Sequence, residues 1–275
     1  KSELEEVRSF TGKIDKLRKL ETGGISYNAF TDKEYVHYFT ISLSDKSQQA
    51  VDFILNGLIN SEIREEQVKK EKGVILDEYD LFREDIQSYI FSLNDSGLWP
   101  NGDLGHSILG NRNSIESMGV NNLSVFRCNN YSKAPIFVIV GDTKKFNFFD
   151  YINDKIKNLK FEEEILKTKN QKTPTSTKLI YIDKRNKNRI NVIVGFRTCS
   201  FADWHQVVVL NFIKNYLANG WVSKLNESLR LKNDLTYWVE GYSNYFSDTG
   251  SLKFSFSVEK KDINKSLSLF FTEIN

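Results

Sequence analysis

Apolar and polar residues alternate between positions 25 and 44, which is the two-residue period of a β-strand. The pattern then changes to the period of a helix, because apolar side chains recur three and four positions apart from Val51 to Leu58. We therefore predict a strand within residues 25–44 and a helix within residues 46–60, with Ser44 or Asp45 as the helix N-cap. The side chains predicted to share one face of the strand are Tyr35, His37, Phe39, Ile41 and Leu43.

Helical spacing continues over residues 61–93, which predicts one or two long helices. Residues 94–122 are rich in Gly, Asn and Asp and predict turns. The uninterrupted apolar run at 134–142 predicts a buried strand, and residues 151–161 predict a short helix. The long helices are expected to turn six side chains inward: Val68, Val74, Ile75, Leu81, Phe82 and Ile86.

A polar stretch that contains Pro174 and has no periodicity separates two successive series of strands and helices. Antiparallel hairpins occur in both series, which predicts an α+β fold of two similar domains. We place the domains at residues 1–162 and 178–275, with a linker at 163–177, and expect the second domain to be incomplete. The elements predicted after the linker are strands at 178–184 and 189–198, a helix over 204–230 with a break at Gly220, and two antiparallel strands around residues 247–250.

Composition narrows the class of protein. With 275 residues and 40% hydrophobic content, the chain is long enough to form a sizeable core. Its 38 basic and 36 acidic residues give a net charge of +2, which favours neither nucleic acid nor a membrane surface as partner. We predict no membrane span, because no apolar run approaches the roughly 20 residues that one needs. Cys128 and Cys199 are expected to be free thiols, and Lys1 leads straight into a charged stretch that does not look like a signal peptide.

The three histidines are isolated from one another in the sequence. His37, His106 and His205 form no H-x-x-H, H-x-x-x-H or H-x-H pair. A zinc site usually begins with two ligands close together on one element. A zinc site made from these three residues is therefore not expected.

Two other pairs can carry chemistry. Glu71 and Glu78 are seven residues apart, about two helical turns, so their carboxylates share one helix face. Arg230 and Tyr237, also seven apart, lie where a helix is predicted to lead into a strand, and their donors suit a peptide carbonyl and the oxyanion that develops on it. The simpler interpretations are a solvated acidic stripe for the first pair and an unrelated surface Arg and strand Tyr for the second.

These pieces follow one another in a recognisable order. "GGISYNAFTDKEYVHYF", "EKGVILDEYD", "GHSILGNRNSI", "FVIVGD" and "LRLKNDLTY" together resemble the pitrilysin/insulinase family of zinc peptidases, on the branch of the mitochondrial processing peptidase. The resemblance covers nearly the whole chain. It implies paired α+β domains, two pairs of which close over an unfolded peptide. In active members two His of an inverted H-x-x-E-H motif bind zinc, and the Glu between them is the general base.

The resemblance implies a role for each pair. Glu78 occupies the position of a third zinc ligand, and Glu71 is the other member of that glutamate pair. Arg230 and Tyr237 match residues that contact substrate near the scissile bond. An edge strand to which substrate adds as an extra strand matches Asn28, Ala29, Phe30 and Thr31.

The zinc motif is the point of departure from the family. H-x-x-E-H should lie shortly before "GGISYNAFT", where this chain reads "SELEEVRSFTG". One register puts Ser2 and Glu6 at the His positions with Glu5 as the base. The other register puts Glu3 and Val7 there with Glu6 as the base. We therefore predict a degenerate zinc site, comprising Ser2, Glu5, Glu6, Glu71 and Glu78, with no metal or other cofactor in this chain.

The resemblance implies a zinc-less, peptide-binding subunit of a heterodimeric peptidase, inactive alone, whose partner carries H-x-x-E-H and the zinc. Arg230 and Tyr237 would be its contribution to the shared cavity. The favoured context is precursor or leader-peptide processing in the bacterial cytoplasm, as in maturation of subtilosin-type bacteriocins; clearance of short peptides is the rival. Two alternatives stay open: an active zinc endopeptidase whose motif lies outside this sequence, and a structural subunit like the core subunits of respiratory complex III.

Overall fold

The computed structural model of the chain describes residues 17–100, 102–162 and 188–275. The chain divides into two units, residues 1–71 with 117–165 and residues 72–116 with 166–275. Both units contain helices and antiparallel strands, which confirms the predicted α+β class. The predicted linker at 163–177 and strand at 178–184 lie outside the described residues, so the predicted domain boundaries remain a prediction.

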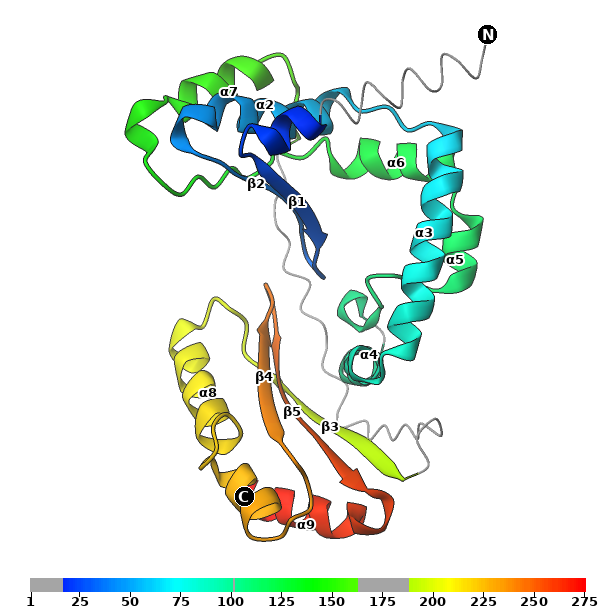
Figure 1. The fold of residues 1–275 in the computed structure, drawn as a ribbon, viewed down its shortest axis with the longest axis vertical. Helices are drawn as coiled ribbons and strands as arrows, with labels where there is room; N and C mark the ends of the chain where they lie inside the picture. The colour runs from blue at the N-terminus through cyan, green and yellow to red at the C-terminus, as the bar shows by residue number, and fades with distance from the viewer. Residues whose placement is uncertain (1–16, 101, 163–187) are drawn as a thin grey trace. The chain divides into compact units, whose positions relative to one another are not determined.

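The sheet of the first unit is an antiparallel hairpin of β1 (Ser26–Thr31) and β2 (Val36–Ile41) (Figure 1). The strand predicted within residues 25–44 is therefore two strands joined by a turn, in which the Asp32 N–H donates to the Tyr35 carbonyl at 2.8 Å. The helix predicted next is α2 (Ser47–Asn60), which packs against β2. Tyr27 on β1 also contacts α2, because its ring centroid lies 4.8 Å from that of Phe53.

The start of α2 differs from the prediction, because no side chain caps it. Ser44 and Asp45 instead belong to a short 3-10 helix, η1 (Ser44–Lys46), that leads into α2. The Ser47 N–H donates to the Ser44 carbonyl, and the Ser47 hydroxyl donates to the same oxygen at 2.9 Å. The Ser44 carbonyl thus accepts from the first N–H of α2, which would otherwise lack a partner inside the helix.

Two more helices of the first unit are attached to α2. The pattern did not predict α6 (Val120–Asn130), whereas α7 (Phe148–Ile156) corresponds to the short helix predicted at 151–161. Arg127 on α6 donates to the Leu58 carbonyl near the C-terminal end of α2, at 2.9 Å. Tyr151 on α7 donates to the Asp52 carboxylate at 2.8 Å. A 3-10 helix, η3 (Thr143–Lys145), precedes α7.

The predicted buried strand at 134–142 is wrong for the described structure. The segment pairs with no strand among the described residues. Three of its side chains are largely exposed: Ile136 at 90%, Val138 at 79% and Val140 at 93%. An apolar run specifies a preference for burial, but a strand forms only where a neighbour completes its hydrogen bonds, and that neighbour cannot be read from the run itself.

The helical stretch predicted at 61–93 is confirmed as two helices, α3 (Glu65–Glu84) and α4 (Ile86–Leu98). Asp85 separates them and caps α4, because its carboxylate accepts from the N–H groups of Gln87 and Ser88. Two predicted inward residues are exposed, Val74 at 53% and Leu81 at 66%. They lie seven residues apart on a face of α3 that no described residue buries.

The predicted turns at 94–122 are partly helical. α4 continues to Leu98, and a 3-10 helix, η2 (Asp103–Gly105), and α5 (Arg112–Ser117) follow it. Arg112 forms a salt bridge with Asp80 on α3, which holds α5 beside that helix. Turn-forming residues therefore mark the connections here but do not exclude short helices between them.

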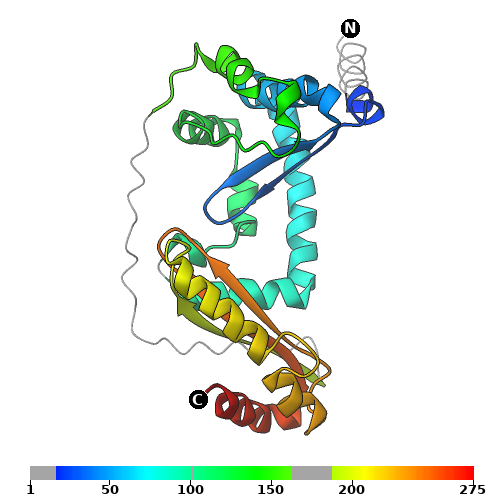
Figure 2. The same cartoon turned by 90° about the vertical axis from the view of Figure 1, so that its left-hand side faces the viewer.

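The second unit contains a three-stranded antiparallel sheet in the order β3 (Arg189–Thr198), β5 (Gly250–Glu259), β4 (Val239–Tyr245). The strand at 189–198 and the antiparallel pair around residues 247–250 are as predicted, whereas the pattern did not predict the order of the strands. The apolar face of the central strand packs against α9 (Ile263–Ile274), which a 3-10 helix, η5 (Lys260–Asp262), introduces. Phe254, Phe256 and Phe270 are almost completely buried there. Figure 2 shows α8 (Trp204–Leu217) lying across this sheet, and α8 contacts β4.

The opposite face of β5 is polar and also buried. Ser251, Lys253 and Ser255 alternate with the apolar residues and are at most 3% exposed. The helix α4 packs on this sheet through β3, and Lys253 forms a salt bridge with Asp95 on α4. This ion pair and the apolar core on the other side hold the sheet that positions the residues discussed next.

Candidate functional site

The link between α8 and β4 is fixed by one buried amide. After α8 the chain turns at Gly220, with φ of +119°, and enters a π-helix, η4 (Asn226–Leu231). The Asn226 side chain donates to the carbonyls of Ala218, Gly220 and Val239 at 3.0, 3.1 and 3.1 Å. It also accepts from the Val239 N–H at 3.1 Å. Short π-helical turns are rare and are frequent at functional sites.

The π-helix turns its inner face into the core and leaves Arg230 on its outer side. Leu225 and Leu229 are completely buried, whereas Arg230 is half-buried. A turn follows in which the Asp234 N–H donates to the Arg230 carbonyl at 3.0 Å, with Asp234 at φ +49°. The chain then continues to Tyr237 and β4. This compact return explains why two residues seven positions apart can meet.

Arg230 and Tyr237 do lie together. The guanidinium carbon of Arg230 lies 4.9 Å from the centroid of the Tyr237 ring and 4.2 Å from that of Trp221. Both rings remain mostly exposed, Tyr237 at 74% and Trp221 at 69%. Sequence reasoning missed Trp221; its only signal is an aromatic residue placed directly after the helix-breaking Gly220.

Within the described part of the chain, the charge of Arg230 is not neutralised. Among the described residues, no carboxylate pairs with its guanidinium and no hydrogen-bond acceptor engages it. The nearby Glu227 instead pairs with Lys232 at 2.9 Å. This hydrogen bond and charge lower the pKa of Glu227 and raise the pKa of Lys232. A guanidinium with rings against it keeps its in-plane N–H groups for an oxygen acceptor, and the Tyr237 hydroxyl adds one more donor.

The predicted substrate strand is the outer edge of the β1–β2 hairpin. In an antiparallel ladder the hydrogen-bonded pairs alternate, so the pair Asp32/Tyr35 implies that Ala29 and Thr31 direct their backbone groups away from β2. Accordingly, the Ala29 N–H donates a hydrogen bond to the Asn28 side-chain oxygen, at 2.8 Å, and not to β2. No other described strand pairs with this edge of β1. Phe30 is 45% exposed and lies 4.9 Å, ring to ring, from His37.

The residues at predicted zinc positions do not form a metal site in the described part of the chain. Glu71 and Glu78 lie on α3 and both are exposed. Within residues 17–100, 102–162 and 188–275, no three His, Cys, Asp or Glu residues come together as a metal cluster. Two exposed carboxylates alone do not fit zinc, which takes about four ligands in tetrahedral geometry. Ser2, Glu3, Glu5, Glu6 and Val7 lie outside the described residues.

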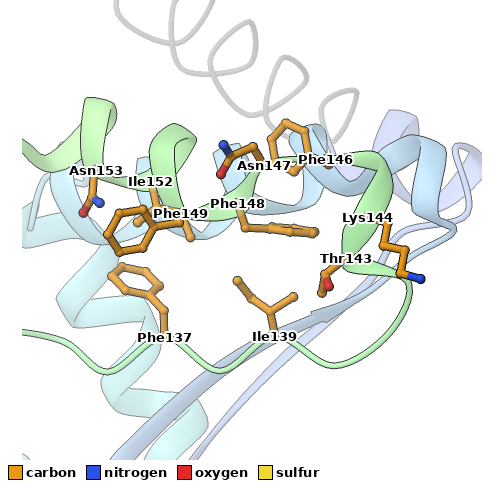
Figure 3. Close-up of a pocket in the computed structure, with 10 residues that line it drawn as sticks. All are labelled: Phe137, Ile139, Thr143, Lys144, Phe146, Asn147, Phe148, Phe149, Ile152 and Asn153. Atoms are coloured by element: carbon orange, nitrogen blue, oxygen red, sulfur yellow. The ribbon is translucent and has the colours of Figure 1, made fainter.

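A cavity of about 730 Å³ lies in the first unit, between residues 137–139 and α7 (Figure 3). Its polar side chains are Thr143, Lys144, Asn147 and Asn153, with Lys144 at one end and Asn153 at the other (Figure 3). No Asp, Glu, His or Cys is among the residues that line it. The apolar side chains that line it are Phe137, Ile139, Phe146, Phe148, Phe149 and Ile152.

Two family models match the chain in succession. The model described as "Insulinase (Peptidase family M16)" matches residues 11–112, and the one described as "Peptidase M16 inactive domain" matches residues 132–275. The fold and the two matches define a peptidase-type α+β protein. The chain belongs to peptidase family M16, which confirms the resemblance seen in the sequence.

Relatives carry peptidase names. An uncharacterized zinc protease, YmxG of Bacillus subtilis, is 24% identical over 231 residues, covering 83% of this chain and 55% of that protein. The human mitochondrial-processing peptidase subunit beta is 27% identical over 147 residues, covering 50% of this chain and 30% of that protein. The chain thus spans about half the length of bacterial relatives such as YmxG.

Solved structures agree on the fold. A protease from Helicobacter pylori superposes with a TM-score of 0.80 at 16% identity, covering 92% of this chain and 63% of that one. A peptidase M16 inactive domain from Pseudomonas fluorescens gives 0.75 at 14% identity, covering 94% and 63%. The described residues contain no helix that is long and apolar enough to cross a membrane.

Proposed function

We propose that this chain is a zinc-less, peptide-binding subunit of a heterodimeric M16 peptidase and that it supplies Arg230 and Tyr237 to a shared active-site cavity. The observation that carries the proposal is the meeting of these two residues, which leaves an exposed phenol beside a guanidinium with no acidic partner among the described residues. Donors that have no acceptor among the described residues and lie on a fixed backbone are suited to a ligand rather than to the fold.

The lack of an H-x-x-E-H motif in the printed sequence supports a partner subunit that binds the zinc. The printed sequence has no H-x-x-E-H motif, and its three histidines are isolated. The described histidines also have separate surroundings: His37 lies against Phe30, and His205 stacks on Trp204 at 3.7 Å. In this proposal Glu71 and Glu78 are remnants of the family's ligand positions, and a homologous subunit binds the zinc. The human relative is itself named as a subunit, in agreement with a peptidase of more than one chain.

The proposed roles of this chain's own residues follow from their donors. An extended peptide adds to the outer edge of β1 along Asn28, Ala29, Phe30 and Thr31. It bonds to the N–H and carbonyl of Thr31 and to the carbonyl of Ala29, whose N–H is bonded to the Asn28 side chain. Arg230 and Tyr237 donate hydrogen bonds to the carbonyl oxygen of the bond to be cut. These bonds strengthen as negative charge develops on that oxygen, which is the source of catalysis in such sites.

We further propose that the peptidase processes a precursor in the bacterial cytoplasm, for which leader-peptide removal from a bacteriocin is the favoured case. Relatives named zinc proteases in bacteria, together with a mitochondrial-processing peptidase subunit, support a processing role. An extended-strand binding mode suits a leader, because an unfolded segment can add to a sheet edge without first being unfolded.

The test is co-expression of the full-length protein with an M16 member of the same bacterium that contains H-x-x-E-H. Zinc content and cleavage of a mixed peptide pool are measured for each protein alone and for the pair. The proposal expects no zinc and no cleavage by this protein alone, and cleavage by the pair. Stoichiometric zinc and cleavage by this protein alone would instead indicate a motif outside the printed sequence. A stable pair whose rate does not depend on Arg230 or Tyr237 would indicate a structural subunit.

A further inference from the structure

We propose that Trp221 is a third residue of the Arg230–Tyr237 site, which positions the Arg230 guanidinium and forms the wall against which an apolar side chain of the bound peptide packs. The inference rests on the proposed peptide-binding function and adds the class of peptide to it: an extended segment with a bulky apolar residue next to the carbonyl that Arg230 binds.

The backbone that carries Trp221 is firmly held. The Gly220 carbonyl accepts from the Ser223 N–H at 3.2 Å, from the Ser223 hydroxyl at 2.8 Å and from the Asn226 amide at 3.1 Å. The positive φ of Gly220 directs the chain out of α8 at this point. The backbone position of Trp221 is therefore set by the turn.

The side chain itself contributes little to the core. Its ring is 69% exposed and does not belong to the buried cluster formed around Leu225, Leu229 and Phe270. A large exposed indole on a fixed backbone costs little conformational entropy when it meets a ligand. Fold stability therefore does not explain why a tryptophan stands at this position.

The one described partner of the Trp221 ring is Arg230. The guanidinium carbon lies closer to the indole, at 4.2 Å, than to the Tyr237 ring, at 4.9 Å. A cation over an aromatic ring is stabilised by the ring's electron-rich face, and an indole is the best such partner. Trp221 thus restrains the longest and most flexible side chain of the site.

The three residue types together indicate a peptide-binding surface. Trp, Tyr and Arg are the residues most enriched where binding energy concentrates in protein interfaces. Successive side chains of an extended peptide point to opposite faces, so a peptide whose carbonyl accepts from Arg230 has a neighbouring side chain on the side of one of the two rings. The exposed part of the indole is apolar and suits an aromatic or aliphatic side chain there.

The experiment uses the full-length protein and two fluorescein-labelled, acetylated and amidated Gly/Ser/Thr peptides that differ only in a central Phe or Ala. Binding is followed by fluorescence anisotropy. We expect the wild type to bind the Phe peptide about tenfold more tightly than the Ala peptide. Trp221→Ala should weaken binding of the Phe peptide by about tenfold and remove the preference, whereas Trp221→Phe should retain both within about threefold.

Trp204→Ala is the matched control, because Trp204 is similarly exposed at 62% but stacks on His205 and not on an arginine. It should leave both affinities unchanged, and all variants should unfold at the wild-type temperature. Equal binding of the two peptides by the wild type, or a preference that survives in Trp221→Ala, overturns the inference.

Arg230→Ala and Tyr237→Phe are measured in the same binding assay. If these two variants weaken peptide binding and Trp221→Ala does not, only the role of Trp221 is wrong. If none of the three variants weakens peptide binding, the proposed peptide site is wrong as well.

Discussion

The side chain of Asn226 pairs with the backbone of Val239 in both directions, accepting from its N–H and donating to its carbonyl, each at 3.1 Å. This pair joins the π-helix to the first residue of β4. Arg230 lies on one of the joined elements and Tyr237 lies two residues before the other. The distance between the two candidate functional residues therefore depends on an amide that touches neither of them.

Asn226→Ala should destabilise the second unit. The change leaves the N–H and carbonyl of Val239 and the carbonyl of Ala218 without their partner in a buried place, and each unsatisfied buried group costs about 1–3 kcal/mol. We expect a loss of at least about 3 kcal/mol in the free energy of unfolding, measured by urea denaturation. Asn60→Ala is the control, because the exposed Asn60 amide donates to the Asn56 side chain and bonds to no other described residue. Equal losses for the two variants would contradict the role given to Asn226.

Tyr237→Phe should slow the assembled peptidase without disturbing assembly. The variant keeps the ring beside Arg230 and removes only the hydroxyl donor, and loss of one such donor typically costs about 2.7–4 kcal/mol of transition-state stabilisation. We expect kcat to fall by about a hundredfold or more, with the same yield of the two-subunit complex. Tyr216→Phe removes a hydroxyl from an exposed tyrosine of α8 and should have no effect. An unchanged kcat in the Tyr237 variant would remove this residue from the mechanism.

Part of this site could be read from the sequence, and part of it could not. Arg230 and Tyr237 are seven residues apart and separated by a helix end and a strand start, so the sequence already indicates that they lie near each other. Trp221 reaches Arg230 only because Gly220 adopts a positive φ and Asn226 fixes the turn, and no periodicity encodes either of these. The α+β class, in contrast, could be predicted, because it depends on the local periods of strands and helices.

The apolar segment at 134–142 shows the other limit of the pattern. Its composition predicts burial, but Val140 is 93% exposed. Strand pairing depends on neighbours that are remote in the sequence, and the apolar run does not specify them. The two long helices illustrate the same distinction. Their existence follows from local spacing, whereas the exposure of Leu81 depends on which element covers that face.

The buried ion pair of Lys253 and Asp95 gives a prediction for the sheet of the second unit. The Lys253 side chain is 4% exposed and the Asp95 side chain 16%, so removing one partner leaves a charge in a poorly solvated place. Lys253→Met should cost about 3–5 kcal/mol in the free energy of unfolding. The double variant with Asp95→Leu should recover much of this loss, because an apolar pair of similar size carries no desolvation penalty. Strictly additive losses in this double-mutant cycle would show that the two charges do not depend on each other.

Tyr242 gives a prediction for the alkaline range. Burial, and then a hydrogen bond to Glu240, raise the pKa of Tyr242 to about 12, against about 10 in an unfolded chain. A raised pKa means that the folded state favours the protonated phenol, so this contribution to stability is complete below about pH 10 and is lost as the pH rises towards 12. Tyr242→Phe keeps the edge contact with Phe91 and should reduce the decline of unfolding free energy between pH 10 and 12. An equally steep decline in the variant would assign it to other groups.

The edge of β1 gives the sharpest test of how a peptide is bound. The ladder alternation directs the Thr31 N–H away from β2, so Thr31→Pro removes a hydrogen-bond donor from the outer edge without removing one from the hairpin. In the assembled peptidase we expect KM to rise by about fivefold or more, the effect of losing one hydrogen bond of about 1 kcal/mol, with little change in kcat. Thr31→Val, which keeps the N–H and nearly the same shape, should behave like the wild type.

Phe30→Pro is a second control, because the Phe30 N–H bonds within the β1–β2 ladder and not at the outer edge. This variant should lower the stability of the protein as well. If Thr31→Pro and Thr31→Val give the same KM, the peptide does not add to β1 at this position, and the substrate must be held elsewhere.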